Sequence, residues 1–148
     1  MEATVYRDIG LHEDRHWWFT ARRAIVRDFL NSTLPANPSR RVLDVGTGCG
    51  GMLPVLAEFG SVTGMDANDE ALASASTRAR GARLLKGQLP EGLPTGERFD
   101  LVTAFDVIEH IPEVVEALTN MRQALAPGGR LVMTVPALGV TTTGTPQE

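Results

Sequence analysis

The chain has 148 residues, the size of one domain, with 43% apolar residues and a formal net charge of −4. It lacks the run of roughly 18 apolar residues that a membrane helix needs, and it lacks the cluster of basic residues that suits a nucleic-acid backbone. Its one cysteine, Cys49, excludes an internal disulfide framework and suits a reducing compartment. We therefore expect a cytoplasmic protein with a small-molecule substrate and with neither a nucleic-acid nor a membrane partner.

The first half of the chain predicts a helix followed by two strands. Residues 17–30 carry apolar side chains at helical spacing, with arginines on the other faces. The Asn-, Ser- and Pro-rich stretch at 31–38 ends this helix. The elements that follow are a strand, a helix and a strand, at residues 41–45, 52–59 and 61–65.

The second half continues this alternation. Asn68 can cap an alanine-rich helix that extends to Arg80, and Pro112, favoured at a first helical position, opens a helix that extends to Ala124. A turn is expected at residues 127–129, and the remaining strands at residues 83–86, 99–105 and 130–135. Strands separated by helices of about 10–15 residues predict right-handed βαβ units and a parallel sheet, an α/β architecture.

A glycine-rich turn follows the first strand, in the sequence Val-Leu-Asp-Val-Gly-Thr-Gly-Cys-Gly-Gly at residues 42–51. Glycines at such a turn allow unusual backbone dihedrals and let N–H groups approach a ligand. Gly46, Gly48 and Gly51 fit the dinucleotide spacing G-x-G-x-x-G, whereas Gly46, Gly48 and Gly50 fit the G-x-G-x-G of methyltransferases. The loop alone leaves both cofactors open, as well as a tight turn with no ligand.

Asp66 is expected at the end of the second strand, 20 positions after Gly46. An acidic residue there can accept hydrogen bonds from both hydroxyls of a ribose. NAD enzymes and methyltransferases share this feature, so it indicates an adenosine-type ligand without naming it. The alternative interpretation is an exposed loop aspartate or a helix cap.

The downstream motifs distinguish the two cofactors. Residues 99–111 and 125–132 closely resemble the fourth- and fifth-strand motifs of class I S-adenosylmethionine-dependent methyltransferases. Residues 16–23, His-Trp-Trp-Phe-Thr-Ala-Arg-Arg, resemble the N-terminal helix of one subgroup that methylates small molecules. The resemblance runs from about Tyr6 to Pro136. It implies a doubly wound Rossmann-like parallel sheet of strand order 3-2-1-4-5, with S-adenosylmethionine as the cofactor.

The resemblance also implies roles for individual residues. Asp44 would orient the methionine ammonium group, and Asp66 would hold the ribose hydroxyls. The other expected cofactor-binding residues are Gly46, Thr47, Gly48 and Gly50 along the methionine and ribose, Ala67, Gln88 and Leu89 along the adenine, and Phe105 and Asp106 facing the sulfonium and the incoming nucleophile.

His110 is the candidate catalytic base, because a histidine can accept a proton from an oxygen acceptor near neutral pH. Its alternative role is to pack or cap at the start of a helix. With Glu109 it could form half of a metal site, but no further ligand can be named and no metal is predicted. One of Trp17 and Trp18 is expected in the core, and the other, or Phe19, over the cofactor.

The domain organisation predicted from these motifs has three parts: an N-terminal helical cap at 1–38, the S-adenosylmethionine-binding domain at 39–137, and an irregular tail at 138–148. The expected function is in-line transfer of a methyl group to a small-molecule acceptor. Members of the family usually continue beyond the fifth strand, so the usual C-terminal strands are expected to be lacking or truncated. The alternative is therefore a cofactor-binding module that is inactive or fragmentary. The exposed apolar edge of the fifth strand predicts a homodimer.

Overall fold

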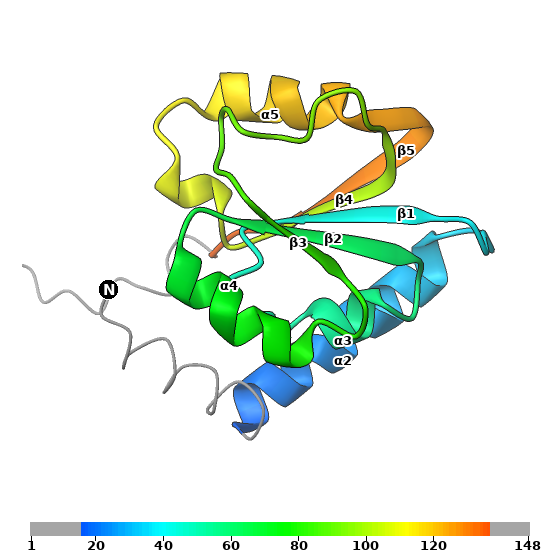
Figure 1. Ribbon diagram of the computed structural model, residues 1–148. Helices are drawn as coiled ribbons and strands as arrows, with labels where there is room; N and C mark the ends of the chain where they lie inside the picture. Colours follow the sequence, from blue (N-terminus) through cyan, green and yellow to red (C-terminus); the bar gives the residue numbers. More distant parts are fainter. Residues whose placement is uncertain (1–15, 137–148) are drawn as a thin grey trace, which may run out of the picture.

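The computed structural model describes residues 16–136 (Figure 1). Five parallel strands form one sheet in the order β3-β2-β1-β4-β5, which confirms the predicted doubly wound architecture. The strands are β1 (Arg41–Val45), β2 (Ser61–Asp66), β3 (Arg83–Lys86), β4 (Phe99–Phe105) and β5 (Leu125–Thr134).

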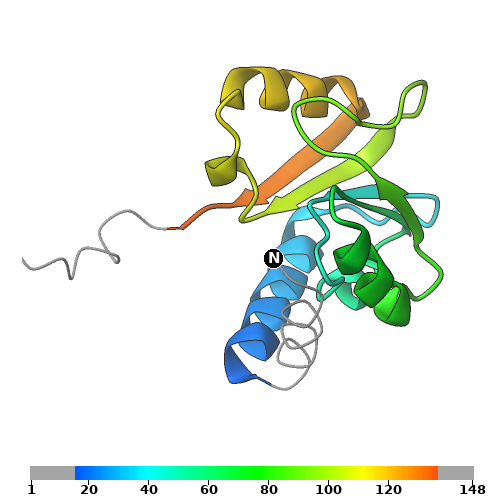
Figure 2. The same ribbon diagram turned by 60° about the vertical axis from the view of Figure 1, so that its left-hand side comes forward.

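Helices cover both faces of this sheet. They are α2 (Trp17–Thr33), α3 (Leu53–Leu56), α4 (Asp69–Ala75) and α5 (Val114–Gln123), with short 3₁₀ turns η1 (Ser76–Arg78) and η2 (Ile108–His110). Helices α2, α3 and α4 lie on one face and α5 lies on the other, as Figures 1 and 2 show. None of the helices in residues 16–136 has the length and apolarity that crossing a bilayer requires.

Local sequence signals explain several helix ends. The side chain of Asn68 accepts hydrogen bonds from the backbone N–H groups of Glu70 and Ala71, so the predicted cap of α4 is confirmed. The prediction that Pro112 opens α5 is wrong, because the helix begins at Val114. Ile111 has the extended backbone that a residue before proline favours, and the chain needs two more residues to turn into the helix.

Further boundaries differ from the prediction. The helix expected to extend to Arg80 ends as α4 at Ala75 and is followed by the 3₁₀ turn η1. The helix expected over 52–59 is shortened to α3, with turns on either side. The turn expected at residues 127–129 is an irregularity inside β5, where the register against β4 shifts between Phe99 and Leu101 and Gly128 adopts φ +76°. The fifth strand therefore starts at Leu125 rather than Arg130, because its first residue pairs with Phe99 before this bulge.

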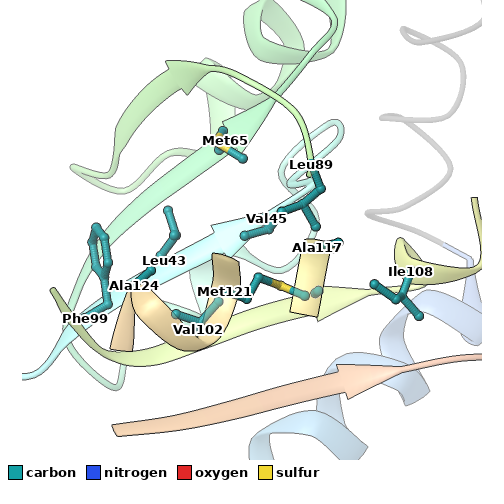
Figure 3. Packing of buried hydrophobic residues seen from close by; sticks show 11 residues of the cluster. Leu43, Val45, Met65, Leu89, Phe99, Val102, Ile108, Ala117, Met121 and Ala124 are labelled. Carbon is teal, nitrogen blue, oxygen red and sulfur yellow. The ribbon is translucent and has the colours of Figure 1, made fainter. Parts of the chain in front are cut away.

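The sheet has an apolar cluster on each face, because the strands are covered on both sides. The cluster beneath α5 is drawn in Figure 3 and contains Leu43, Val45, Met65, Leu89, Phe99, Val102, Ala104, Ile108, Ala117, Met121 and Ala124. The cluster on the other face contains Val26, Leu30, Val42, Leu53, Leu56, Val62, Ala75 and Leu101.

The prediction that a tryptophan of α2 packs in the core is wrong. Trp17 is 72% exposed and Trp18 is 52% exposed. The helix instead turns Val26 and Leu30 toward the sheet, with Phe19 half-buried one heptad before Val26 on the same face. The two tryptophans precede that face at the start of the helix and project into solvent.

Candidate functional site

The predicted cofactor-binding residues converge at the carboxyl end of the sheet. They follow β1 (Gly46, Thr47, Gly48, Gly50), end or follow β2 (Asp66, Ala67), follow β3 (Gln88, Leu89) and end or follow β4 (Phe105, Asp106). Asp44 lies within β1. Open α/β sheets bind ligands at this end, on either side of the point where the strand order reverses. Here the reversal falls between β1 and β4.

Two cavities at this end share Gly46. The first, of about 140 Å³, is lined by Phe19, Arg22, Arg23, Asp44, Gly46, Thr47, Gly48, Gly51, Met52 and Phe105. The second, of about 320 Å³, is lined by Val45, Gly46, Asp66, Ala67, Gly87, Gln88, Leu89, Asp106, Val107, His110 and Ile111. The glycine loop therefore separates a smaller charged cavity from a larger cavity beside the ends of β2 and β3.

Gly46 is the tightest point of this loop. It adopts φ +70°, and a Cβ placed there would lie 2.5 Å from Cγ2 of Val107. The next residue, Thr47, donates its backbone N–H to the carbonyl oxygen of Met65 at 2.9 Å, which ties the loop to β2. Only glycine satisfies both the left-handed backbone and the close approach of the loop to Val107.

Asp44 is the buried acid of the site, with 2% of its surface exposed. The hydroxyl of Thr47 donates to Oδ2 of Asp44 and the hydroxyl of Thr103 donates to Oδ1, both at 2.7 Å. Burial raises the pKa of Asp44 to about 6, against the lowering effect of these two hydrogen bonds. A cation that binds beside this carboxyl group would therefore favour its ionised form.

Asp66 links the end of β2 to the glycine loop. Its Oδ2 accepts the backbone N–H of Gly48, and its Oδ1 accepts the backbone N–H of Asn68, both at 2.9 Å. Each carboxylate oxygen keeps a second lone pair for another donor. The loop thereby fixes the orientation of Asp66 while leaving it able to accept hydrogen bonds from a ligand.

The sequence motifs gave no indication of a connection from α2 to the ends of β4 and β5. Nη1 of Arg22 lies 2.5 Å from Oδ2 of Asp106, and Nη2 of Arg22 donates to Oγ1 of Thr134 at 3.1 Å. The hydroxyl of Thr134 in turn donates to Oδ1 of Asp106 at 3.1 Å. The only signal for this in the sequence is the Arg22-Arg23 pair, whose partner far along the chain no local pattern identifies.

Comparison with known proteins agrees with this geometry. The family model described as a methyltransferase domain matches residues 17–143, most of the chain. The chain belongs to this methyltransferase family. The match favours the methyltransferase interpretation of the glycine loop over the dinucleotide one. It also places the first cavity and the Arg22–Asp106 contact within the matched region of the methyltransferase domain.

Individual relatives are similar over most of the methyltransferase domain. The ubiquinone biosynthesis O-methyltransferase of Rhizobium johnstonii is 32% identical over 142 residues, covering 87% of this chain and 57% of that protein. The protein of the same name from Paramagnetospirillum magneticum is 38% identical over 115 residues, covering 75% of this chain and 43% of that protein. The chain thus spans about half the length of these curated relatives.

Among solved structures, CalS10 from Micromonospora echinaspora shares the fold with a TM-score of 0.71 and 31% sequence identity. The alignment covers 90% of this chain and 56% of CalS10. CalS10 is described as an amino pentose methyltransferase, and its structure contains bound S-adenosylmethionine.

His110 of the methyltransferase domain lies in η2, with 78% of its side chain exposed. Its Nε2 is 3.7 Å from Oε1 of Glu109, and the residue lines the second cavity together with Asp106. In the described part of the chain, no three His, Cys, Asp or Glu side chains gather in a way that could hold a metal ion. Phe19, rather than Trp17 or Trp18, is the aromatic residue of α2 that lines the first cavity.

Proposed function

We propose that the chain binds S-adenosylmethionine and transfers its methyl group to a small-molecule acceptor. The observation that carries this proposal is the pair of cavities joined at Gly46, one with charged partners for an amino acid and one with partners for a nucleoside. The family match and the structural similarity to CalS10 support the same cofactor.

The first cavity suits the methionine end of the cofactor. Asp44 would pair with the α-ammonium group, because a cation offsets the cost of ionising a buried carboxyl. Arg23 lines the same cavity and would contact the α-carboxylate. Arg22, which pairs with Asp106, lines this cavity too. An anion and a cation in one cavity match the zwitterion of an amino acid.

The second cavity suits the adenosine end. Asp66 would accept hydrogen bonds from the two ribose hydroxyls through the lone pairs that Gly48 and Asn68 leave unused. Ala67 and Leu89 would contact the faces of the adenine, and the amide of Gln88, which has both donors and an acceptor, would reach its edge.

The cofactor carries its methyl group on a positively charged sulfur, so it is already activated for displacement by a nucleophile. The task of the chain is to position the acceptor atom opposite that sulfur. Phe105 lines the first cavity and Asp106 lines the second, so these neighbours flank the junction where we place the reacting atoms. His110 would take the proton from an acceptor hydroxyl, since it lines the second cavity with Asp106.

A binding comparison tests the cofactor assignment. Calorimetric titration of the 148-residue chain should show saturable binding of S-adenosylhomocysteine and none of NAD at the same concentration. The reverse preference would overturn the proposal. Binding of S-adenosylhomocysteine without methyl transfer to any hydroxylated small acceptor would instead support the alternative, a cofactor-binding module that does not turn over.

We further propose a small acceptor rather than a nucleic acid, consistent with the net charge of −4, and a cytoplasmic location, consistent with one cysteine that is buried. The division into a cap at 1–38, a cofactor domain at 39–137 and a tail at 138–148 stays a prediction. Residues 1–15 of the cap and the whole tail lie outside the described residues.

A homodimer through β5 is also proposed. Within residues 16–136 this strand pairs only with β4, so its other edge is open. Met133 on this strand is 38% exposed, and Val135 just after it is 58% exposed. An open edge with exposed apolar side chains is a template for a second chain.

A further inference from the structure

A cavity of about 390 Å³ lies at the amino end of the sheet, opposite the end where we place the cofactor. Its lining includes the first residues of four strands: Arg41 of β1, Ser61 of β2, Arg83 of β3 and Phe99 of β4. Arg80, from the loop before β3, also lines it. None of these residues contributes to the two cavities that meet at Gly46.

The strand register places polar side chains together in this cavity. Arg41 pairs with Ser61, and Thr63 pairs with Arg83, so each pair lies side by side on one face of the sheet. Thr63 is only 6% exposed, and within residues 16–136 its hydroxyl makes no hydrogen bond. A buried hydroxyl in a cavity without a protein partner points to a ligand that supplies one.

Positive charge dominates the cavity. Arg41, Arg80 and Arg83 contribute three guanidinium groups, and one carboxylate, that of Glu97, faces two of them. The carboxylate of Asp100 accepts the backbone N–H of Arg41 at 2.8 Å. The Arg80 side chain is exposed and forms no ion pair or hydrogen bond with the described residues.

The contacts of Glu97 show that two of these arginines can hold one oxyanion. Nη2 of Arg83 lies 2.8 and 2.9 Å from the two carboxylate oxygens, and Nη2 of Arg41 lies 2.9 Å from Oε1. The Arg41 guanidinium also lies over the ring of Phe99, 5.1 Å from its centroid, which orients it. Planar guanidinium forks of this kind suit carboxylate and phosphate groups.

The backbone of Arg80 is strained. It adopts φ +49°, a left-handed conformation that glycine adopts at lower cost. Strained backbone in a folded protein tends to occur at functional sites. Here the strained residue, which has no ion pair within residues 16–136, lines a cavity that already contains two arginines.

We propose that this cavity binds the phosphate group of a small molecule. Arg80 and Arg83 contact the phosphate oxygens, and the hydroxyl of Thr63 donates a hydrogen bond. The carboxylate of Glu97 occupies part of this site and competes with the ligand. The cavity volume and the net charge of −4 favour a small phosphate over a polyanion such as nucleic acid.

The test is a titration of the ¹⁵N-labelled 148-residue chain with inorganic phosphate and, separately, with glycerol 3-phosphate, at an ionic strength held constant with sodium chloride. Saturable shifts are expected for the amides of residues 80–83. Tighter binding of glycerol 3-phosphate would identify a phosphate ester as the ligand. Equal binding would identify free phosphate.

Three variants sharpen this test. Arg80→Gln should weaken phosphate binding about tenfold or more, as expected for a lost charged hydrogen bond. Lys86→Gln, which removes an exposed cation paired with Asp69 at the carboxyl end of the sheet, is the matched control and should bind as the parent does. Glu97→Gln should bind phosphate more tightly, because the competing charge is gone.

Arg80→Gly separates loss of binding from loss of folding. It removes the cation and also relieves the left-handed backbone, so it should raise the Tm while weakening phosphate binding. Shifts that grow linearly without saturating, or equal phosphate affinity in the Arg80→Gln and Lys86→Gln variants, would overturn the proposal.

Discussion

Asp44 carries a carboxyl group that is almost completely buried. It is buried in the central strand between the hydroxyls of Thr47 and Thr103, and its pKa is raised to about 6. Burial accounts for this shift, since both hydrogen bonds act in the opposite direction. A raised pKa at the bottom of a cavity is a common property of functional acids, and it makes the charge of this site depend on pH.

The first prediction follows from linkage. The folded chain binds the Asp44 proton more tightly than the unfolded chain does, so the contribution of Asp44 to the free energy of unfolding is greatest below pH 4 and is lost as the pH rises through about 6. Ionisation of the buried carboxyl then lowers the free energy of unfolding by about 3 kcal/mol. Asp44→Asn should remove this dependence and raise the free energy of unfolding at pH 7, measured by urea denaturation between pH 4 and pH 8. An unchanged pH profile in the variant would contradict the assignment.

The opposite behaviour is expected for binding. S-adenosylhomocysteine should bind the parent chain more tightly as the pH rises through 6, because ionised Asp44 pairs with the ammonium group. Asp44→Asn should bind it weakly at all of these pH values. Calorimetry over the same pH range measures both effects, and equal affinity at pH 5 and pH 7 in the parent chain would exclude this contact.

The second prediction concerns Asp66. Asp66→Ala should weaken S-adenosylhomocysteine binding by about 1.5–3 kcal/mol, as expected when hydrogen bonds to a charged group are lost. The same change leaves the N–H of Gly48 without its acceptor, so circular dichroism must show that the fold is retained. Unchanged affinity in a folded variant would mean that the ribose is held elsewhere.

The third prediction concerns His110. If it accepts a proton during methyl transfer, His110→Ala should reduce turnover by about 10²–10⁴. The side chain is largely exposed, so stability should not change. Near-normal turnover in this variant would assign His110 a structural role instead.

Helix α2 contacts the ends of β4 and β5 through Arg22. Arg22 contacts Asp106 at the end of β4 and Thr134 at the end of β5, and Asp106 itself adopts φ +54°. Helix α2 therefore lines the first cavity and also contacts Asp106, the strained residue that lines the second. The positive charge of Arg22 also lowers the pKa of Asp44. This element links the two cavities electrostatically as well as sterically.

The fourth prediction tests this link by a double-mutant cycle. Arg22→Met and Asp106→Asn should each destabilise the chain, and together they should cost less than the sum, with a coupling energy of about 1 kcal/mol for a half-exposed pair. Arg22→Met alone should also move the pH dependence of the free energy of unfolding to higher pH, because the loss of a nearby cation raises the pKa of Asp44. Additive effects of the two changes would show that the contact contributes nothing.

The fifth prediction concerns the molecule as an assembly. The open edge of β5 carries exposed Met133, and the flanking helices α2 and α5 expose Ile25, Phe29 and Val115. Met133→Lys should convert the proposed dimer to a monomer, measured by light scattering, since a charge on an edge opposes pairing. Ala73→Lys, on the exposed side of α4 near the opposite edge of the sheet, is the matched control. A monomeric parent chain at high concentration would rule out the dimer.

Much of the architecture could be predicted from local patterns. The strands at 41–45, 83–86 and 99–105 have the predicted bounds, and Asn68 caps α4 as expected. The candidate site residues other than Asp44, which lies within β1, fall at or just after the carboxyl ends of strands. Alternation of apolar segments and glycine turns is a property of neighbouring residues, so the sequence alone specifies it.

The remaining features depend on residues that meet only in the folded chain. Arg22 meets Asp106 across 84 positions, and Thr63, Arg83 and Glu97 meet only through strand register and a loop. The exposure of Trp17 and Trp18 likewise depends on which face of α2 the sheet covers. Spacing along the chain carries no information about such contacts, because the distances are set by packing. The sequence by itself therefore determined the parallel sheet, and its family resemblance implied the strand order and the position of the candidate cofactor site. The link from α2 and the arginine cavity follow only from the three-dimensional arrangement.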